Sequence, residues 1–518
     1  MALNIADNEA SKFEGFAKKG AFLAVLFFAL LSLIALDHDL KVEEDSGVYI
    51  SLAKSLSVGH GYRDIYYAEN PPHTKYPPVF SLLLAPLISF LGLNFLAMKL
   101  LVVVMGILAL YVIYVFHRAV ADSLITSLVV IFTATSHGIV FYSQSIMTEI
   151  PYLLLSLLAL FWLLRCSSQG TWSGKAAALT VILIPLVYLT RLVGLSLLLA
   201  AVAYLLFESP GGPGVRTKRA VTIGGIAAVP ALGWFLRNWW LGNSAGPSYW
   251  GGGYANVVYG SPYATERVLT LVNLKKYILA HARVIFFDFP WMSATLLPML
   301  LTLVIFAGFI WCAIRRRTIL EYYVLVYMGA LLAFPGTRPQ RYLVPLIPFI
   351  WYYFFTATSR ILSWLCRKAR FFDPSRERQA VLTGMLVLFL ALLISNGWTA
   401  VVGNVVYGGR EGYYHVIGED EYKNVALWAK THTPPDSVFI WAKPALRYLW
   451  SARHAADVRT RSEEDALRYI RTRKVDHVVV DSFSERERNP RLVEKYPDYF
   501  RLVYANGVSK VYKVTYPK

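Results

Sequence analysis

One connection between two apolar segments gathers side chains that could do chemistry. Carboxylates crowd residues 37–45, ending at Asp45, and Tyr49 follows four residues later. A helix that begins after Asp45 would put Asp45 and Tyr49 on one face. Asp45 could instead cap that helix, because a carboxylate oxygen at the N-cap accepts a free backbone N–H. The carboxylates could also hold a divalent cation, but short acidic runs are usually solvated, so we assign no metal ligand and no cofactor.

Glu149 is the second candidate, because it stands at the start of a long apolar segment. A charge that faced lipid there would cost about 3 kcal/mol, so the side chain should point inward and have a partner. Arg191 and Arg237 are the candidate partners. Glu149 could be a catalytic part or one half of a structural ion pair, and the residues alone leave both open.

Two histidines lie in the same connection as Asp45, and two arginines lie in a later one. His60 and His73 could titrate near neutral pH, although a surface role is the simpler interpretation. Arg338 and Arg341 bracket Pro339 and could extend toward lipid headgroups.

The chain is too apolar for an ordinary soluble protein. Of its 518 residues, 56% are hydrophobic, and the mean hydropathy is +0.46. Apolar segments able to cross about 30 Å of hydrocarbon begin near residues 21, 96, 123, 149, 175, 193, 220, 293, 322, 342 and 379. The sequence therefore predicts a polytopic α-helical membrane protein with about eleven transmembrane helices.

The positive charge sets the expected topology. The net charge is +18, from 51 Lys and Arg against 33 Asp and Glu, and basic clusters occupy alternate short connections at 216–219, 315–317 and 367–378. This bias is typical of cytoplasmic loops, so we predict no nucleic-acid partner. A cytoplasmic N-terminus and an odd number of spans put the C-terminal segment outside. The proline-interrupted stretch 76–92 is then one or two helices at the outer membrane surface.

The tail has a different pattern. Helical periodicity at 421–431, 445–450 and 462–474 alternates with strand patterns at 438–442, 475–481, 501–507 and 509–514. We expect a transmembrane domain over residues 1–402, with a catalytic first outer loop at about 37–92, and a small soluble α/β domain with a mixed sheet over 403–518.

Several short motifs resemble the GT-C glycosyltransferases, which include the protein O-mannosyltransferases and the aminoarabinose transferase of lipid A. The acidic residue, helix and Gly-x-Gly turn of the first outer loop look like the start of that family. Further motifs follow in the same order, namely residues 74–78, 148–149, 190–194, 236–238 and 341–345. In that family a second acidic residue commonly follows the first. Here Ser46 stands at that position, directly after Asp45.

The resemblance implies roles for individual residues. Asp45 would be the carboxylate that takes or orients the acceptor proton, with Glu149 as a second catalytic candidate. Lys75, Arg341 and Tyr342 match positions near the lipid phosphate, and Arg338 joins them by placement alone. Tyr49, Arg191 and Arg237 would support the site.

The same resemblance implies a function. We expect a hexosyl- or pentosyltransferase that moves a sugar, with inversion, from a polyprenyl-phosphate donor to a hydroxyl of a surface glycolipid, polysaccharide or protein. It would be a multi-pass protein of the plasma (inner) membrane, with a periplasmic or extracellular C-terminal domain that covers the cavity or meets the acceptor. The alternative is a transporter or flippase of lipid-linked saccharides, although no paired inverted halves are visible. A non-catalytic membrane scaffold is the third interpretation.

Overall fold

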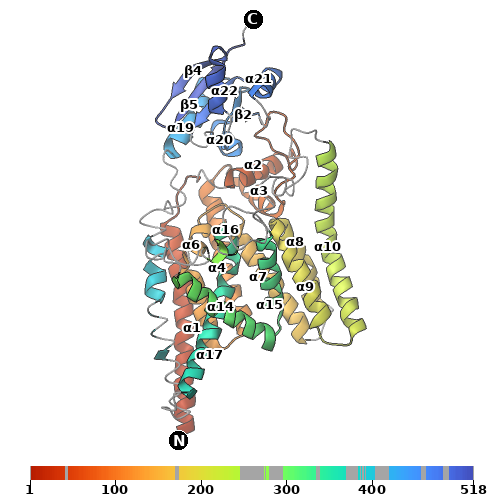
Figure 1. Ribbon diagram of the computed structural model, residues 1–518, viewed down its shortest axis with the longest axis vertical. Helices are drawn as coiled ribbons and strands as arrows, with labels where there is room; N and C mark the ends of the chain where they lie inside the picture. Colours follow the sequence, from red (N-terminus) through yellow and green to blue (C-terminus); the bar gives the residue numbers. More distant parts are fainter. Residues whose placement is uncertain are drawn as a thin grey trace. The chain divides into compact units, whose positions relative to one another are not determined.

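The computed structural model is mostly helical and has one small sheet (Figure 1). It describes residues 2–40, 45–169, 174–244, 274–280 in part, 296–333, 339–368, 383–402 in part, 419–456, 463–481 and 489–516. Contacts divide the chain into two compact units. The first comprises residues 1–37, 99–236 and 255–413, and the second comprises 38–98, 237–254 and 414–518.

Most helices of the first unit begin close to the predicted span starts. The helices are α1 (Ala2–Ile34), α4 (Phe95–Arg118), α5 (Ser123–Thr135), α6 (His137–Ser143), α7 (Glu149–Gln169), α8 (Lys175–Thr190), η1 (Leu192–Gly194), α9 (Leu195–Phe207), α10 (Pro213–Ser244), α14 (Leu296–Arg315), α15 (Ile319–Leu332), α16 (Pro339–Leu343), η3 (Val344–Leu346) and α17 (Ile347–Lys368). However, α1 begins at Ala2, well before the predicted start near residue 21, and one end each of α4 and α10 belongs to the second unit.

Some of these helices can cross a membrane on their own. Within the described residues, α4, α7 and α10 are long and apolar enough, and the pair α5 and α6, bent by 56°, would be a fourth span. The predicted number of eleven spans therefore stays a prediction. The predicted span near residue 379 lies largely outside the described residues.

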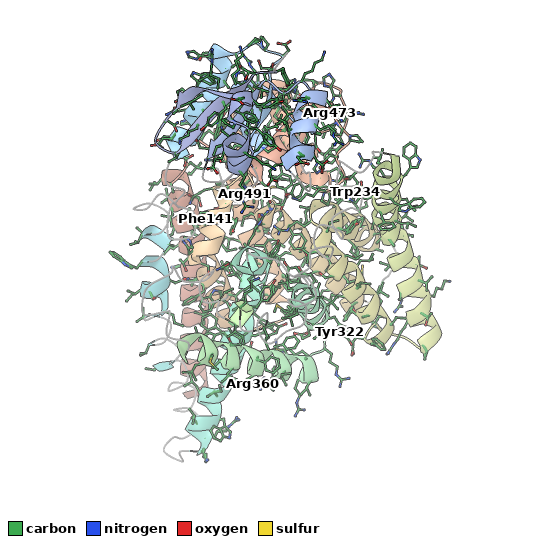
Figure 2. All side chains as sticks on the ribbon, turned by 45° about the horizontal axis from the view of Figure 1, so that its top comes forward. Phe141, Trp234, Tyr322, Arg360, Arg473 and Arg491 are labelled. Carbon is green, nitrogen blue, oxygen red and sulfur yellow. The ribbon has the colours of Figure 1, made fainter. Side chains whose placement is uncertain are left out.

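The helices pack closely within the first unit. α1 packs on α5, α5 on α17, and α17 on α14, while α7 packs on α8 and α9 on α15. At Gly308 of α14 a Cβ would lie 2.1 Å from the Tyr353 carbonyl oxygen of α17, so only glycine allows this backbone approach. Tyr322 and Arg360 lie toward the lower end of the unit in Figure 2, and Phe141 and Trp234 toward the upper end.

The second unit contains the mixed sheet that the tail predicted. Its strands are β1 (Val438–Ile440), β2 (His454–Ala455), β3 (His477–Asp481), β4 (Phe500–Ala505) and β5 (Ser509–Val514), in the order β2-β1-β3-β5-β4. β1 is parallel to β2 and β3, and β5 is antiparallel to β3 and β4. The helices are α2 (Ser46–Ser57), α3 (Val79–Leu91), α19 (Glu419–His432), α20 (Pro444–Ser451), α21 (Glu463–Thr472), α22 (Asn489–Lys495) and η5 (Pro497–Tyr499).

The boundary of this unit differs from the predicted division of the chain. Contacts group the connection 38–98 with the C-terminal segment, whereas the sequence assigned that connection to the membrane part. α3, within the stretch 76–92, is a single helix of 13 residues and is too short to cross a membrane.

A buried histidine gives the sheet a pH dependence. His477 of β3 stacks on Phe439 with ring centroids 4.7 Å apart, and its Nδ1 has no hydrogen-bond partner among the described residues. Burial, with smaller and opposite effects of Asp476 (raising) and Lys513 (lowering), brings the pKa of His477 down to about 4. The neutral ring is therefore the form that fits the folded state.

We predict that the unfolding temperature of the native chain falls relative to that of His477→Phe between pH 7 and pH 5. The folded-state pKa lies below the ordinary value of 6.5, so His477 is neutral in both states above pH 6.5 and costs no stability there. As pH falls from 6.5 toward 4, the unfolded chain binds the proton more readily than the folded one, and stability is lost. Phenylalanine keeps the stacking and cannot titrate. Parallel melting temperatures across this range would contradict the assignment.

Candidate functional site

The predicted site residues fall into two groups, one in each unit. Glu149, Arg191, Arg341 and Tyr342 belong to the first unit, and Asp45, Tyr49, Lys75 and Arg237 belong to the second. Arg338 lies outside the described residues. Each group is built by its own contacts.

In the first unit, one carboxylate oxygen holds two arginines. Glu149 Oε1 lies 2.5 Å from Arg191 Nη1 and also accepts a hydrogen bond from Arg341 Nε. Glu149 is fully buried, and Arg191 is 9% exposed. Arg191 Nη1 also donates to Thr148 Oγ1 at 3.2 Å, and its guanidinium carbon lies 5.7 Å from the ring centre of Tyr342. The three charged side chains carry a net charge of about +1, which suits an anion.

Breaks in the helices bring these groups together. Glu149 is the first residue of α7, where the free N–H groups of a helix N-terminus favour a carboxylate. Arg191 has extended backbone between α8 and η1, and Arg341 lies in the short α16. Of the two partners predicted for Glu149, Arg191 is in contact with it. Arg237 instead bonds within the second unit, and Arg341, predicted only near the lipid phosphate, takes its place.

In the second unit, Asp45 directly precedes α2, but it does not cap this helix. Its side chain makes no cap hydrogen bond, although its carbonyl oxygen accepts from Val48 N at 3.0 Å and Tyr49 N at 3.3 Å. The alternative that Asp45 is only a cap is therefore wrong. Tyr49 is buried, with its ring centre 5.0 Å from that of Tyr76 and 5.3 Å from that of Phe80.

Residues 73–77, which we call the Lys75 turn, are held by buried polar side chains. His73 Nε2 accepts from Tyr76 N at 2.8 Å, so Nδ1 carries the proton and donates to Asp64 Oδ1 at 2.7 Å. Tyr62 Oη donates to the carbonyl oxygens of Tyr76 and Pro77 at 3.0 and 3.1 Å. The ammonium of Lys75 lies 4.6 Å from the ring centre of Tyr76.

The C-terminal end of α10 bonds to the same turn. Arg237 Nη1 donates to the His73 carbonyl oxygen at 2.9 Å, and Asn238 Nδ2 donates to the Thr74 carbonyl oxygen at 2.9 Å. Burial also raises the pKa of Tyr62, which keeps this phenol protonated and able to donate.

The expected surface role of His73 is wrong, since it is 3% exposed and both ring nitrogens are bonded. His60 is exposed, as expected.

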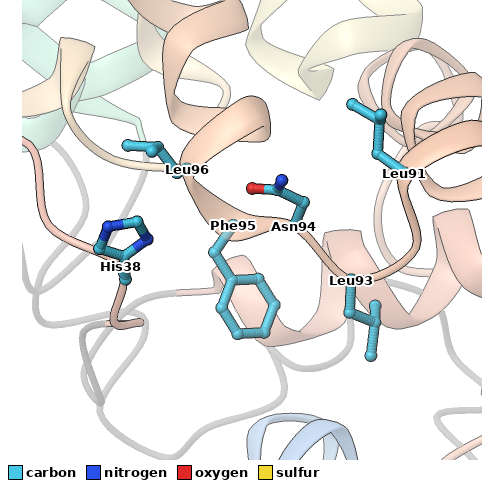
Figure 3. A pocket seen from close by; sticks show the side chains of 6 residues that line it. All are labelled: His38, Leu91, Leu93, Asn94, Phe95 and Leu96. Atoms are coloured by element: carbon cyan, nitrogen blue, oxygen red, sulfur yellow. The ribbon is translucent and has the colours of Figure 1, made fainter.

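Clustered metal ligands or a cavity could mark a site among the described residues. No three His, Cys, Asp or Glu side chains gather in the described part of the chain, and Glu43 and Glu44 lie outside it. A cavity of about 450 Å³ is lined by His38, Leu91, Leu93, Asn94, Phe95 and Leu96 (Figure 3). None of these is a predicted site residue.

Solved structures have a similar arrangement. An oligosaccharyltransferase from Archaeoglobus fulgidus, tethered with an acceptor peptide, has 14% identity and a TM-score of 0.55 over 96% of this chain and 74% of its own. ArnT from Cupriavidus metallidurans, bound to undecaprenyl phosphate, has 13% identity and a TM-score of 0.57 over 95% and 97%. The arabinofuranosyltransferase AftD from Mycobacteria has 13% identity and a TM-score of 0.53 over 96% and 42%.

The chain has the GT-C fold. No family model matches the sequence, and no curated protein does so either. At such low identity the GT-C likeness establishes the architecture, and the roles of single side chains have to rest on their own geometry.

Sequence reasoning missed several residues that build these groups. Asp64, Tyr62 and Asn238 were not predicted. Tyr62 and Asn238 bond to backbone carbonyl oxygens, and Asp64 bonds to the His73 ring, all of which only the fold brings near. One signal was available, since Asn238 follows Arg237 in a motif that resembles the GT-C family.

We predict that Glu149→Gln lowers the free energy of unfolding in detergent by about 3 kcal/mol, because it leaves two largely buried guanidinium groups without their shared charge. Thermal unfolding of the purified protein would measure this loss. Glu208→Gln is the control, because the half-buried Glu208 accepts only a 3.0 Å bond from Tyr322 and should lose less than about 1 kcal/mol. Equal melting temperatures for native protein and Glu149→Gln would contradict the assignment.

Proposed function

We propose that this chain transfers a sugar from a polyprenyl-phosphate donor to a hydroxyl group of a surface glycolipid, polysaccharide or protein. The reaction would take place on the outer face of the plasma membrane, with the chain spanning the bilayer several times, the N-terminus in the cytoplasm and the C-terminal domain outside. Two GT-C neighbours were solved with lipid phosphates, undecaprenyl phosphate in ArnT and dolichol phosphate in the Archaeoglobus oligosaccharyltransferase AglB.

The main observation in support of this proposal is that one oxygen of Glu149 binds both Arg191 and Arg341. Arg191 and Arg341 converge on it and leave a positive excess at the break between α8 and η1. A guanidinium group binds two phosphate oxygens in its own plane, and in a water-poor site it stabilises charge that develops on a leaving phosphate. Because Glu149 Oε1 is already engaged twice, Glu149 serves to hold the arginines rather than to take a proton. Tyr342 supplies a neighbouring phenol.

Asp45 is the proposed base. As the acceptor oxygen bonds to the anomeric carbon, its proton passes to the Asp45 carboxylate, and the carbon–oxygen bond to the phosphate breaks with its electron pair. The configuration at the anomeric carbon is thereby inverted, and polyprenyl phosphate leaves. A positioned base typically contributes about 10²- to 10⁴-fold.

Lys75 is the proposed phosphate ligand of the first outer loop, with Tyr49 and Arg237 in support. Hydrogen bonds from His73, Tyr62 and Arg237 fix the backbone of the Lys75 turn, so less backbone entropy is lost when the lysine binds an anion. We keep the division into a membrane part, 1–402, and an outer α/β part, 403–518, as part of this proposal.

We predict that Asp45→Asn abolishes transfer without unfolding the protein. Purified protein is given a panel of polyprenyl-phosphate sugars and a membrane extract as acceptor, and mass spectrometry follows polyprenyl phosphate and new glycosides. The rate should fall by about 10²-fold or more, because the amide cannot accept the proton. Glu69→Gln, an exposed acid paired with Arg473 at 2.9 Å, should keep the native rate. Full activity of Asp45→Asn would refute the base assignment.

The Lys75 turn gives a second prediction. His73→Phe keeps the ring packing on Tyr62 and Tyr76 but removes both hydrogen bonds, so the donor KM should rise about tenfold, or about 1.4 kcal/mol, while kcat changes less. Steady-state kinetics with varied donor would measure both constants. The exposed His60→Ala is the control. An unchanged KM would show that the turn has no part in donor binding.

A further inference from the structure

The connection that carries Asp45 shares a hydrophobic core with the C-terminal α/β part of the second unit. Tyr66 and Tyr67 are buried in one cluster with Val425, Phe439 and Val511. Tyr67 pairs with Ala455 in a parallel bridge, in which Ala455 N donates to the Tyr66 carbonyl oxygen at 2.8 Å. The connection therefore continues the edge of the sheet beside β2.

A second contact lies closer to Asp45, where α2 packs on α20. A Cβ at Gly47 would lie 2.8 Å from Leu446 N and 2.9 Å from Leu446 Cα. Both neighbours are backbone atoms of α20, so they cannot rotate away as the end of a flexible side chain could. The two helices touch backbone to backbone at this position, and glycine is required there.

The same interface is held further along α2. Ser51 Oγ donates to the Ala445 carbonyl oxygen at 3.4 Å, and the ammonium of Lys54 lies 4.9 Å from the ring centre of Tyr448. Burial lowers the pKa of Lys54, which fits a partly desolvated ammonium against that ring. One face of α2 is thus set against α20 over its first three turns.

We propose that α20 is a template that fixes the position of Asp45, with Gly47 as the positioning residue. This inference rests on the proposed function, in which Asp45 is the base. Gly47 lies two residues after Asp45, so a shift of α2 away from α20 moves the carboxylate as well. A misplacement of about 1 Å can cost about 10²-fold in rate. The C-terminal domain then acts on the chemical step, in addition to any role in meeting the acceptor.

The test is Gly47→Ala in the full chain, with Gly507→Ala as the matched control. Gly507 also belongs to the second unit, and a Cβ there would meet no atom within 4 Å. We expect Gly47→Ala to lower kcat by about 10- to 100-fold while the donor KM stays within about twofold, because separate bonds hold the Lys75 turn. Gly507→Ala should match the native enzyme in both constants.

A folded Gly47→Ala protein with native kcat would overturn the template role, as would a donor KM that rises while kcat stays constant. If Gly47→Ala does not fold, the kcat values of Lys54→Met and Lys54→Arg test the template role instead. Loss of the cation over Tyr448 should lower kcat about two- to fivefold, and arginine should restore it. Equal kcat for Lys54→Met and native protein would overturn the proposal. If the native chain itself cleaves no donor, the proposed function fails, and the template role with it.

Discussion

The arrangement of the first unit depends on one interaction, in which a single carboxylate oxygen of Glu149 holds two arginines. Glu149 is fully buried, and in an apolar helical unit an unpaired charge at that place would be too costly to keep. Its presence at the start of α7 therefore requires the breaks that deliver Arg191 and Arg341. Paired in this way, the three groups have a residual positive charge that an anionic phosphate would complement.

The second unit has a different constraint, because residues 58–78, between α2 and α3, form no helix and have to be held in place by their contacts. Polar side chains do this at the Lys75 turn, where His73 bonds to Asp64 and to the Tyr76 N–H, and Tyr62 donates to backbone carbonyl oxygens. Apolar packing and a β-bridge hold the same connection in place where Tyr67 pairs with Ala455. The two kinds of contact fix separate parts of the connection, so the proposed donor binding and the proposed proton transfer should be separable by mutation.

Much of the fold could be predicted because its patterns are local. The periodicity of residues 421–431, 438–442 and 475–481 predicted α19, β1 and β3, and most of the apolar segments predicted where the helices of the first unit begin. Arg191 was a predicted partner of Glu149, but Arg341 was not, because the two residues are 192 positions apart and no local pattern joins them. The bridge from Tyr67 to Ala455 and the approach of Gly47 to Leu446 were missed for the same reason. Burial of His73 was missed because its partners are backbone atoms and one acid in an irregular segment.

The most direct test of the central claim asks whether the lipid-linked sugar is cleaved or only moved. Native protein in sealed vesicles is given a polyprenyl-phosphate sugar with isotopic label in the sugar, together with an acceptor extract. Label and polyprenyl phosphate are then followed by mass spectrometry on both sides of the membrane. We predict that label appears in a new glycoside of inverted anomeric configuration, in step with free polyprenyl phosphate. Intact donor that crosses the bilayer without cleavage would contradict the transferase and establish a transporter instead.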